Sequence, residues 1–427
     1  MNASYTPSLL ERRRATLGTH TPLFYDTPLE LVSGKGVWLR GIDGKRYLDA
    51  YNNVPHVGHG HPAVANAVSR QMRKLALNTR YLHPGVVDYA ERLLATFDGP
   101  LDRVAFGNSG SEANELAIRM ARFASGHTGL LMSDFSYHGT TLTLAQATTG
   151  LRTSEALGEN VRTIRIPDST GLDTAAAEHL LASSLAEVDA AIESLQQAGF
   201  GVAAVLFDPL FSTEGLVKPP AGYVEGLIAR VHRAGGLYIA DEVQSGFGRI
   251  GRLMWGHELF DAKPDIVTMG KPMGNGHPLS ATVMGADLLE TFGAENMFFN
   301  TFAGNPVSAA AGDAVLRVME DEQLLPRAAS NGELLKRELT RALSDNPRIK
   351  EVRGDGLFAG MRFTDPDTGE AAPTTAKQVV EAMYRDRVLI SRVGREGEVL
   401  KIRPPLAFER EHAELLVSKL TRIIHAL

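Results

Sequence analysis

The segment from Arg103 to Ala124, RVAFGNSGSEANELAIRMARFA, decides the fold of this 427-residue chain. It begins with a short apolar run, passes through a turn of glycine and serine, and continues into a segment of helical periodicity. The apolar positions of that segment follow the spacing i, i+3, i+4, i+7 of one helix face: Ala113, Leu116, Ala117 and Met120. A strand, a turn and a helix in this order predict one unit of a parallel sheet.

The same alternation of short apolar runs and helical patterns recurs along the centre of the chain. Short apolar runs precede Asp208 (VAAVLF), Asp241 (LYIA) and Gly270 (DIVTM), and longer helical patterns separate them. We therefore expect an α/β protein with a mainly parallel central sheet and crossover helices. Ligands of such sheets bind at the carboxyl ends of the strands. The polar residues that follow each apolar run are expected at these ends. The motifs described below should converge at that edge.

Both ends of the chain have the pattern of α+β material. GVWLRGIDGKRYLDA (residues 36–50) predicts a hairpin around the turn at residues 41–44. Near the other end, NGELLKRELTRALSD (residues 331–345) predicts a helix, and GLFAGMRF and RVLISRV predict strands. We expect a small domain assembled from residues 1–60 and 311–427 around a large domain of residues 61–310.

The composition argues against several classes of function. A formal net charge of -6 gives no overall electrostatic reason to expect nucleic acid or an anionic membrane as a partner. No apolar run approaches the roughly 20 residues that cross a bilayer, and MNASYTPSLLERRRATLG lacks the apolar core of a secretion signal, so we expect a cytoplasmic protein. The absence of cysteine excludes disulfides, thiolate metal sites and cysteine nucleophiles.

Ser109, Gly110 and Ser111 lie where the helix after the first strand is expected to begin. Backbone N–H groups at a helix start, with the positive end of the helix dipole behind them, bind phosphate well. Ser109 with Glu112 also fits a capping box. The turn therefore predicts a phosphate cradle, and an ordinary capped helix is the alternative.

Asp241 ends an apolar run in LYIADEVQSGFGR and is followed by a second acid, Glu242. Alternation along a strand puts one acid on each face of the sheet. A buried carboxylate there needs a cationic partner, which a protonated pyridine nitrogen would supply; a solvated acid or a salt bridge to Arg249 is the alternative. The overlapping GFGRIG, residues 246–251, matches the dinucleotide pattern G-x-G-x-x-G only formally, because no long amphipathic helix follows it.

Lys271 directly follows a strand in DIVTMGKPMGNGHPLSA, ahead of two prolines and two glycines that would hold it in a rigid loop. A lysine in such a protected loop can lose its proton and form a Schiff base with a carbonyl cofactor. A structural lysine is the alternative. Tyr137 and His138 offer an aromatic face and an imidazole, although such a pair can equally belong to the core.

His56, His59 and His61 in HVGHGHP resemble a metal cluster only superficially. Metal sites with three histidines are usually set on defined helices or strands, whereas glycine and proline break this run. We expect a turn with hydrogen-bonding histidines and no metal.

Taken together, five segments closely resemble the class III (ω-aminotransferase-like) family of enzymes that use pyridoxal 5'-phosphate (PLP). They are, in order, NSGSEANELAIRMAR, SYHGTT, ADEVQSGFGRIG, TMGKPMGNGHPLSA and NTFAGNPVSAAA. The resemblance runs from about Pro22 to the C-terminus. It implies the PLP-dependent transferase fold of the aspartate-aminotransferase type (fold type I). It also implies a homodimer with active sites between the subunits, and leaves open whether dimers pair into tetramers.

The same resemblance assigns roles to individual positions. Lys271 would carry PLP as a Schiff base, and Asp241 would pair with the pyridine nitrogen. Gln244 would approach the phenolic oxygen, and Tyr137 and Val243 would enclose the ring.

The remaining cofactor positions surround the ring and its phosphate. The resemblance assigns the phosphate to Gly110 and Ser111, joined by Thr301 from the partner chain. Ser109, from the predicted phosphate cradle, and His138, next to Tyr137, are further candidates for binding the cofactor.

Two positions depart from the transaminases of this family. Lys401, in LKIRPPL, stands where many of them have an arginine that binds the substrate carboxylate and pairs with a glutamate. In FDPLFSTEG, registered on the following PPAGY, Thr213 stands in the glutamate position and Glu214 comes one place later. An ammonium in place of a bidentate guanidinium suits a substrate phosphate. One inserted residue would bring Glu214 into register and favour a transaminase.

With YNNVPHVGHGHP, NTRYLHP and GKPMGNGHP, these departures resemble the ethanolamine-phosphate phospho-lyase branch of the family. The resemblance implies a lyase that converts O-phosphoethanolamine to acetaldehyde, ammonia and phosphate through an external aldimine and a quinonoid. The candidate residues for holding the phosphorylated amine are Asn53, Arg80, Lys401 and Arg403.

Two other functions remain open. A class III ω-aminotransferase shares the early chemistry but requires an oxo-acid as amino acceptor. A catalytically silent protein of the same fold would serve regulation or assembly. The intact Lys271 and Asp241 argue against this last function, because a silent relative has no chemical need for either.

Overall fold

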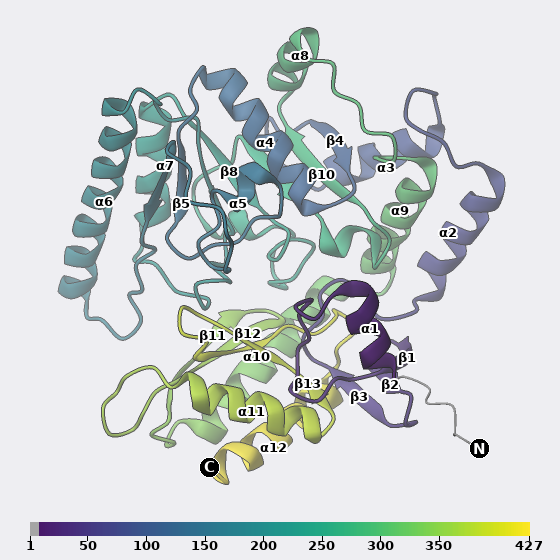
Figure 1. Cartoon of the computed structure of the whole chain (residues 1–427), viewed down its shortest axis with the longest axis vertical. Coiled ribbons are helices and arrows are strands. Elements are labelled where there is room, and N and C mark those ends of the chain that lie inside the picture. The colour runs from purple at the N-terminus through teal and green to yellow at the C-terminus, as the bar shows by residue number, and fades with distance from the viewer. Residues whose placement is uncertain (1–7) are drawn as a thin grey trace.

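The computed structural model describes residues 8–427, which form an upper and a lower part (Figure 1). The upper part contains a seven-stranded sheet, and the lower part contains two four-stranded sheets. Helix α1 (Leu9–Leu17), near the start of the chain, and helix α12 (Arg410–His425), at its end, both lie in the lower part (Figure 1).

The large sheet has the strand order β4-β10-β9-β8-β7-β5-β6. Its strands are β4 (Arg103–Gly107), β5 (Leu130–Ser133), β6 (Val161–Ile164), β7 (Ala204–Phe207), β8 (Leu237–Asp241), β9 (Ile266–Met269) and β10 (Ser280–Met284). Adjacent strands from β6 to β9 are parallel, whereas β10 is antiparallel to both of its neighbours, β9 and β4. The four strands predicted from apolar runs are therefore parallel to one another, and the mainly parallel sheet is confirmed.

β10 is the strand of this sheet that inverts the chain direction. All five of its residues are buried between β4 and β9. It runs antiparallel because residues 270–279 return the chain directly beside β9 without a crossover helix. This return places Lys271 at the carboxyl end of β9, at the start of the connecting loop.

Alternate residues of the strands pack into two apolar clusters, one on each face of the large sheet. On β8, Ala240 belongs to one cluster and Ile239 to the other, which also contains Leu116 of helix α4 (Gly110–Ser125). Asp241 lies two residues after Ile239 and therefore points to the face that α4 covers.

The other helices of the upper part surround this sheet (Figure 1). They are α2 (Pro62–Lys74), α3 (Pro84–Leu94), α5 (Leu142–Ala145), α6 (Thr174–Gln197), α7 (Tyr223–Arg233), α8 (Ala286–Glu295) and α9 (Pro306–Asp321), with the 3-10 turns η1 (Gly256–Leu259) and η2 (Lys271–Gly274).

The lower part is assembled from both ends of the chain, as predicted. β2 (Trp38–Gly41) and β3 (Arg46–Asp49) form the expected hairpin, which β1 (Leu31–Lys35) extends. β13 (Val388–Leu389) pairs in parallel with β3, so the two ends of the chain share one sheet. The exact residue limits of the two domains remain a prediction.

The second small sheet has the order β11-β12-β15-β14. Its strands are β11 (Ile349–Asp355), β12 (Phe358–Phe363), β14 (Ser391–Val393) and β15 (Val399–Ile402), and helices α10 (Leu324–Leu343) and α11 (Pro373–Arg385) belong to the same part. β15 pairs with both β12 and β14 at Lys401. This central position holds Lys401 rigidly.

Arg249 joins the two parts of the molecule. It is fully buried, and its Nη1 donates hydrogen bonds to the carbonyl oxygens of Leu357, at 3.0 Å, and of Pro404. Nη2 contacts Nδ1 of His56 at 3.3 Å. The N–H of Leu357 donates in return to the carbonyl oxygen of Arg249 at 3.1 Å. No helix begins in residues 246–251, so the segment GFGRIG is a structural junction and not a dinucleotide site.

Gly332 of α10 lies against the turn between β11 and β12. A Cβ atom at Gly332 would be 2.2 Å from the carbonyl oxygen of Gly356, which is backbone and cannot move aside cheaply. We predict that Gly332→Ala lowers the free energy of unfolding by about 1–3 kcal/mol, measured by chemical denaturation. Gly293→Ala in α8 is the matched control, because nothing lies within 4 Å of its Cβ position. Equal losses in the two variants would contradict this close approach.

Candidate active site

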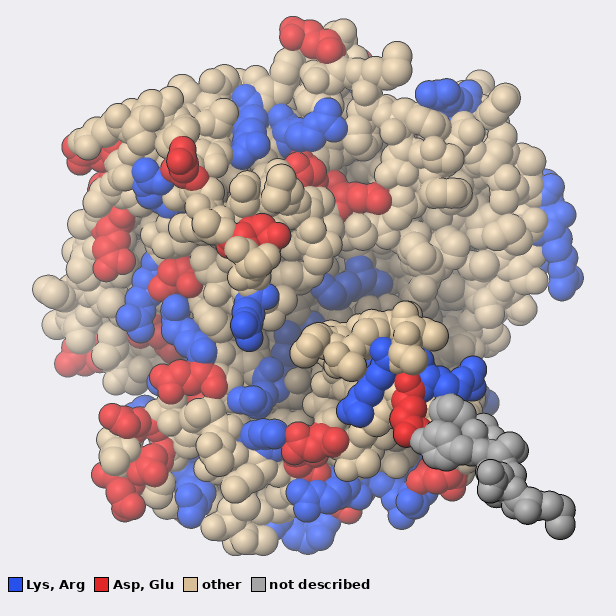
Figure 2. All heavy atoms as spheres, viewed as in Figure 1, with Lys and Arg blue, Asp and Glu red and all other residues tan. Residues whose placement is uncertain are grey.

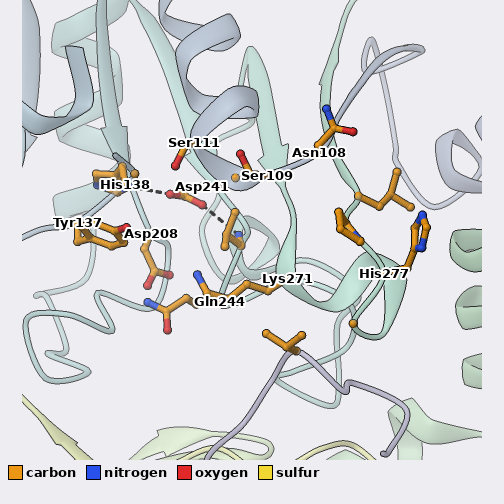
Figure 3. A pocket seen from close by; sticks show the side chains of 17 residues that line it. Asn108, Ser109, Ser111, Tyr137, His138, Asp208, Asp241, Gln244, Lys271 and His277 are labelled. Carbon is orange, nitrogen blue, oxygen red and sulfur yellow. Dashed lines mark hydrogen bonds and ion pairs between the residues drawn. The ribbon is translucent and has the colours of Figure 1, made fainter. Parts of the chain in front are cut away.

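A cavity of about 370 Å³ opens at the carboxyl ends of β8 and β9, beside the first turn of α4 (Figure 3). Its walls contain nearly all of the predicted cofactor residues: Ser109, Gly110, Ser111, Tyr137, His138, Asp241, Val243, Gln244 and Lys271. The remaining wall residues are Val54, Asn108, Gly139, Asp208, Gly276, His277, Pro278 and Leu279. The fold therefore brings four predicted motifs, which lie far apart in the sequence, into one cavity.

Asp241 is held as an anion in the wall of this cavity. Its Oδ2 accepts a hydrogen bond from His138 Nδ1 at 2.7 Å (Figure 3). Oδ2 also accepts one from Asn114 Nδ2 at 3.0 Å, and Oδ1 accepts one from the N–H of Val243 at 3.1 Å. Burial alone would raise the pKa of Asp241, but the hydrogen bond and charge of His138, with Asn114 and Lys271, bring it below its ordinary value. Asp241 thus offers a fixed negative charge to a ligand.

Glu242 belongs to the opposite face, as strand alternation predicts. It is fully buried and accepts hydrogen bonds from the N–H groups of Gly256, at 2.8 Å, and His257, at 2.7 Å. Within residues 8–427, Asp241 forms no ion pair with Arg249. The alternative of an Asp241–Arg249 salt bridge is therefore excluded.

Lys271 projects into the cavity from the first position of η2 (Figure 3). The Lys271 side chain is exposed to the open cavity, but the surrounding protein still restricts its contact with water. This partial desolvation, followed by the charge of nearby Arg403, lowers the pKa of Lys271, although Asp241 and Asp208 oppose the shift. A lysine with a lowered pKa supplies the uncharged amine that Schiff-base formation requires.

The first turn of α4 has the geometry of an anion cradle. Ser109 is the N-cap, and its Oγ accepts a hydrogen bond from the N–H of Glu112 at 3.3 Å. The predicted capping box is only half present, because the Glu112 carboxylate bonds the N–H of Asn108, at 2.8 Å, instead of that of Ser109. A Cβ atom on Gly110 would lie 3.0 Å from the Val243 side chain, so glycine keeps this turn close to the cavity. The N–H groups of the helix start are therefore available to a phosphate.

A second group of charges lies on and after β15. Lys401 and Arg403 are buried, and both donate hydrogen bonds to Oε1 of Gln244, Lys401 at 3.0 Å. Neither forms an ion pair with a carboxylate within residues 8–427. Burial, followed by the charge of Arg403, holds the pKa of Lys401 well below its ordinary value. An anion bound beside these two basic groups would favour their charged forms and would supply the carboxylate-like partner that both lack.

The other predicted substrate residues lie in different surroundings. Asn53 is buried, and its Nδ2 has no hydrogen-bond partner, next to Val54 in the cavity wall. Arg80 is exposed and stacks over the ring of Phe299 at 3.8 Å, away from this cavity. Thr301 is exposed and does not line the cavity of its own chain, and its role in the site of a partner remains a prediction.

Glu214 is buried close to the cavity but does not meet Lys401. No ion pair joins the two residues anywhere in the described chain, so the carboxylate partner expected for a transaminase is missing at Lys401. Burial raises the pKa of Glu214 to about 7, although a hydrogen bond with Ser133 opposes the shift. Thr213 is half-buried, and its carbonyl oxygen accepts a hydrogen bond from Gly394.

The three histidines of HVGHGHP have separate partners. His56 Nε2 donates to the carbonyl oxygen of Phe247 at 2.6 Å, His59 bonds Asp49 at 2.6 Å, and His61 bonds Glu322 at 2.9 Å. Across residues 8–427, no group of three or more His, Cys, Asp or Glu side chains is arranged to hold a metal ion.

The sequence prediction did not include three functional candidates: Asn114, Asp208 and Ser212. Asn114 orients Asp241, and Asp208 lines the cavity and accepts a hydrogen bond from the hydroxyl of Ser212. Burial raises the pKa of Asp208, although Ser212 opposes the shift. Two of them had a signal in the sequence: Asp208 ends a predicted strand, and Asn114 is a polar residue on the apolar face of a predicted helix.

Known proteins resemble this chain over nearly its whole length. Residues 24–424 match the family model of aminotransferase class III. Alanine–glyoxylate aminotransferase 2-like of Drosophila melanogaster is 38% identical over 95% of this chain and 84% of its own length. Ethanolamine-phosphate phospho-lyase homolog 1 of Caenorhabditis elegans is 35% identical over 97% of this chain and 93% of its own length.

Solved structures also resemble this chain over nearly its whole length. A phospholyase from Arthrobacter, in complex with phosphoethanolamine, is 56% identical and superposes with a TM-score of 0.97 over 98% of this chain and 100% of that one. A Bacillus anthracis aminotransferase is 26% identical, with a TM-score of 0.88 over 98% of both chains. The predicted fold of the aspartate-aminotransferase type is confirmed.

Glu214 makes the stability of the fold depend on pH. Its pKa is about 7 in the folded chain against an ordinary value of 4.5, so its burial costs little at pH 4.5 and the full penalty is reached above pH 7. We predict that Glu214→Gln stabilises the protein at pH 8 by about 2 kcal/mol more than at pH 5, measured by urea unfolding. Glu193→Gln, at an exposed carboxylate of α6, is the control and should show no such difference. If Glu214→Gln changed the free energy of unfolding by the same amount at pH 5 and at pH 8, the burial of an ionisable Glu214 would be contradicted.

Proposed function

The chain belongs to the aminotransferase class III family, and we propose that it is a PLP-dependent phospho-lyase that eliminates phosphate from O-phosphoethanolamine. The single observation that carries this proposal is the pair of buried cations, Lys401 and Arg403, beside the cavity of Lys271 and Asp241. A substrate with an amine at one end and a phosphate at the other matches the two sets of charges. The complex of the Arthrobacter phospholyase with phosphoethanolamine supports the same substrate.

The cavity residues fit PLP. Lys271 provides a primary amine for its aldehyde, and Asp241 provides an anion for its protonated ring nitrogen. The start of α4 provides N–H groups for its phosphate, and a Cβ atom at Gly110 would lie in tight contact with Val243, 3.0 Å away. Tyr137 and Val243 are the proposed neighbours of the ring, and His138 supports Asp241.

The proposed reaction uses the side chains in a definite order. When bound, PLP supplies an electron sink for negative charge on the carbon next to the amine nitrogen. Lys271, whose lowered pKa favours the uncharged amine, accepts the proton from that carbon. Asp241 stays ionised throughout, because His138 and Asn114 donate hydrogen bonds to it.

Phosphate then leaves from the neighbouring carbon and takes the electrons of the C–O bond. Lys401 and Arg403 stabilise the charge of this leaving group, and the unpaired amide Nδ2 of Asn53 is a further donor. Water converts the remaining two carbons to acetaldehyde and ammonia, so no oxo-acid is consumed.

The assembly and the location are proposals of the same kind. Large apolar side chains are exposed on the surface of the single chain, among them Tyr81, Leu82, Met297 and Phe302. A homodimer would cover such a surface and would bring Thr301 to the partner's site. No helix within residues 8–427 is long and apolar enough to span a membrane. The cytoplasmic location expected from the sequence stays a proposal.

The proposed function is tested by its products. Purified protein is incubated with PLP and O-phosphoethanolamine without any oxo-acid, and phosphate and acetaldehyde are measured together. We predict equal amounts of both over many turnovers. No release, combined with amino transfer from an amine to pyruvate or 2-oxoglutarate, would instead assign the protein to the ω-aminotransferases. Absence of both activities in the PLP-loaded protein would favour a silent relative.

Lys271 is tested separately from the substrate. We predict that Lys271→Ala abolishes turnover and leaves PLP noncovalent, because no other lysine lines the cavity. Borohydride reduction followed by mass spectrometry should find the cofactor attached at Lys271 in the wild type and attached nowhere in the variant. Lys263→Ala, at an exposed lysine before β9, is the control that should keep both properties. Normal turnover in Lys271→Ala would overturn the central assignment.

A further inference from the structure

Gln244 has an unusual position between the two buried cations and the buried acid Asp208. Its Oε1 accepts hydrogen bonds from Lys401 Nζ, at 3.0 Å, and from Arg403 Nη1. Its Nε2 donates to Ser212 Oγ at 2.6 Å, and Ser212 Oγ in turn donates to Asp208. A continuous chain of hydrogen bonds therefore runs from the cations to the carboxylate.

This chain of hydrogen bonds fixes the direction of the Gln244 amide. Ser212 gives its single hydroxyl proton to Asp208, so its oxygen accepts a proton from Nε2 of Gln244. The carbonyl end of the amide must then face Lys401 and Arg403, which have only donors to offer. One neutral oxygen therefore accepts hydrogen bonds from two positively charged groups.

Acidic groups act on the two cations only through space, Asp208 and Glu214 on Lys401, and Asp208 and Asp49 on Arg403. The ring of Phe358 lies 5.3 Å from Lys401 Nζ and 5.4 Å from the guanidinium carbon of Arg403. Arg403 Nε also donates to the carbonyl oxygen of Tyr51 at 3.3 Å. Within residues 8–427 neither cation forms an ion pair, although removing two charges from water is costly without an anion. A carboxamide oxygen carries a partial charge, whereas a phosphate presents a full charge on several oxygens.

We propose that Gln244 is an internal substitute for the substrate phosphate: its carbonyl oxygen occupies the place of a phosphate oxygen between Lys401 and Arg403 until the substrate displaces it. This inference rests on the proposed function, since it names how the same site selects a phosphorylated amine. An incoming phosphate takes both cations and releases the Gln244 amide, which lines the Lys271 cavity. A neutral amine or alcohol cannot release it, because a neutral oxygen offers the cations no more than Gln244 already does.

The proposal makes opposite predictions for two substitutions at one position. A carboxylate in Gln244→Glu would pair with both cations and compete with phosphate, whereas Gln244→Ala removes the internal substitute and leaves the cations free. Because Gln244 is also the predicted neighbour of the PLP phenolic oxygen, only variants whose absorption spectrum shows full loading with PLP are compared. Inorganic phosphate is the probe, titrated into the PLP-loaded enzyme while the midpoint of thermal unfolding is followed. Loading with PLP is essential, because it fills the phosphate cradle at the start of α4.

We expect phosphate to raise the midpoint of the wild type in a saturable manner. Gln244→Ala should bind phosphate at least as tightly as the wild type, and Gln244→Glu at least about tenfold more weakly, since charged hydrogen bonds must be broken first. Without phosphate, Gln244→Glu should also unfold at a higher temperature than Gln244→Ala. Gln378→Glu on α11 makes the same change at an exposed site and should behave as the wild type.

Three results would overturn the proposal. In the first, phosphate saturates Gln244→Glu at the same concentration as the wild type. In the second, the Ala and Glu variants lose phosphate binding to the same extent. In the third, the wild type does not bind phosphate. If the titrations turn out as expected but phosphoethanolamine is not cleaved, the role of Gln244 stands and the proposed reaction fails. If phosphoethanolamine is cleaved but Gln244→Glu binds phosphate normally, only the role of Gln244 fails.

Discussion

Lys401 and Arg403 are buried without a carboxylate, while Asp241 is buried in the wall of the adjoining cavity and kept ionised by His138 and Asn114. Each arrangement costs free energy in an empty protein, because charges are removed from water without full compensation. The cost falls when a ligand places a cation at Asp241 and an anion between the two basic residues. The protonated ring of PLP satisfies the first demand and the phosphate of the substrate satisfies the second. The chemistry of the site follows from this need for complementary charge.

The fold brings these charges together from two parts of the molecule. β8 supplies Asp241 and leads directly to Gln244, whereas Lys401 comes from β15 of a small sheet. Arg249, five residues beyond Gln244, binds the carbonyl oxygen of Pro404, which follows Arg403 in the chain. One buried guanidinium thus links the segment that follows β8 to the segment that follows Lys401 and Arg403. The lower part of the molecule is a component of the site for this reason, and not only a support for the sheet above it.

The sequence predicted those features that depend on local patterns. Strand alternation separated Asp241 from Glu242, and the polar residues at strand ends converged as expected, so Lys271, Asp241 and the start of α4 share one cavity. Contacts between distant segments were beyond such patterns. Ser212 gains its importance only because it meets Gln244, and Glu112 bonds Asn108 instead of closing the capping box. The antiparallel β10 was missed because direction depends on the length of the preceding loop and not on the residues of the strand. Arg80 was placed near the substrate by resemblance alone, and the structure of the single chain leaves it on the surface.

The most direct measurement is the affinity of the Lys271→Ala protein, loaded with PLP and unable to turn over, for O-phosphoethanolamine and for ethanolamine by calorimetry. The two amines differ only in the phosphate, so their ratio of dissociation constants measures what Lys401 and Arg403 contribute. Complementary charge predicts that phosphoethanolamine binds at least about a hundredfold more tightly, which corresponds to roughly 3 kcal/mol from charged hydrogen bonds. Equal affinities would show that the buried cations do not face the substrate, and would contradict the assignment of this site to a phosphorylated amine.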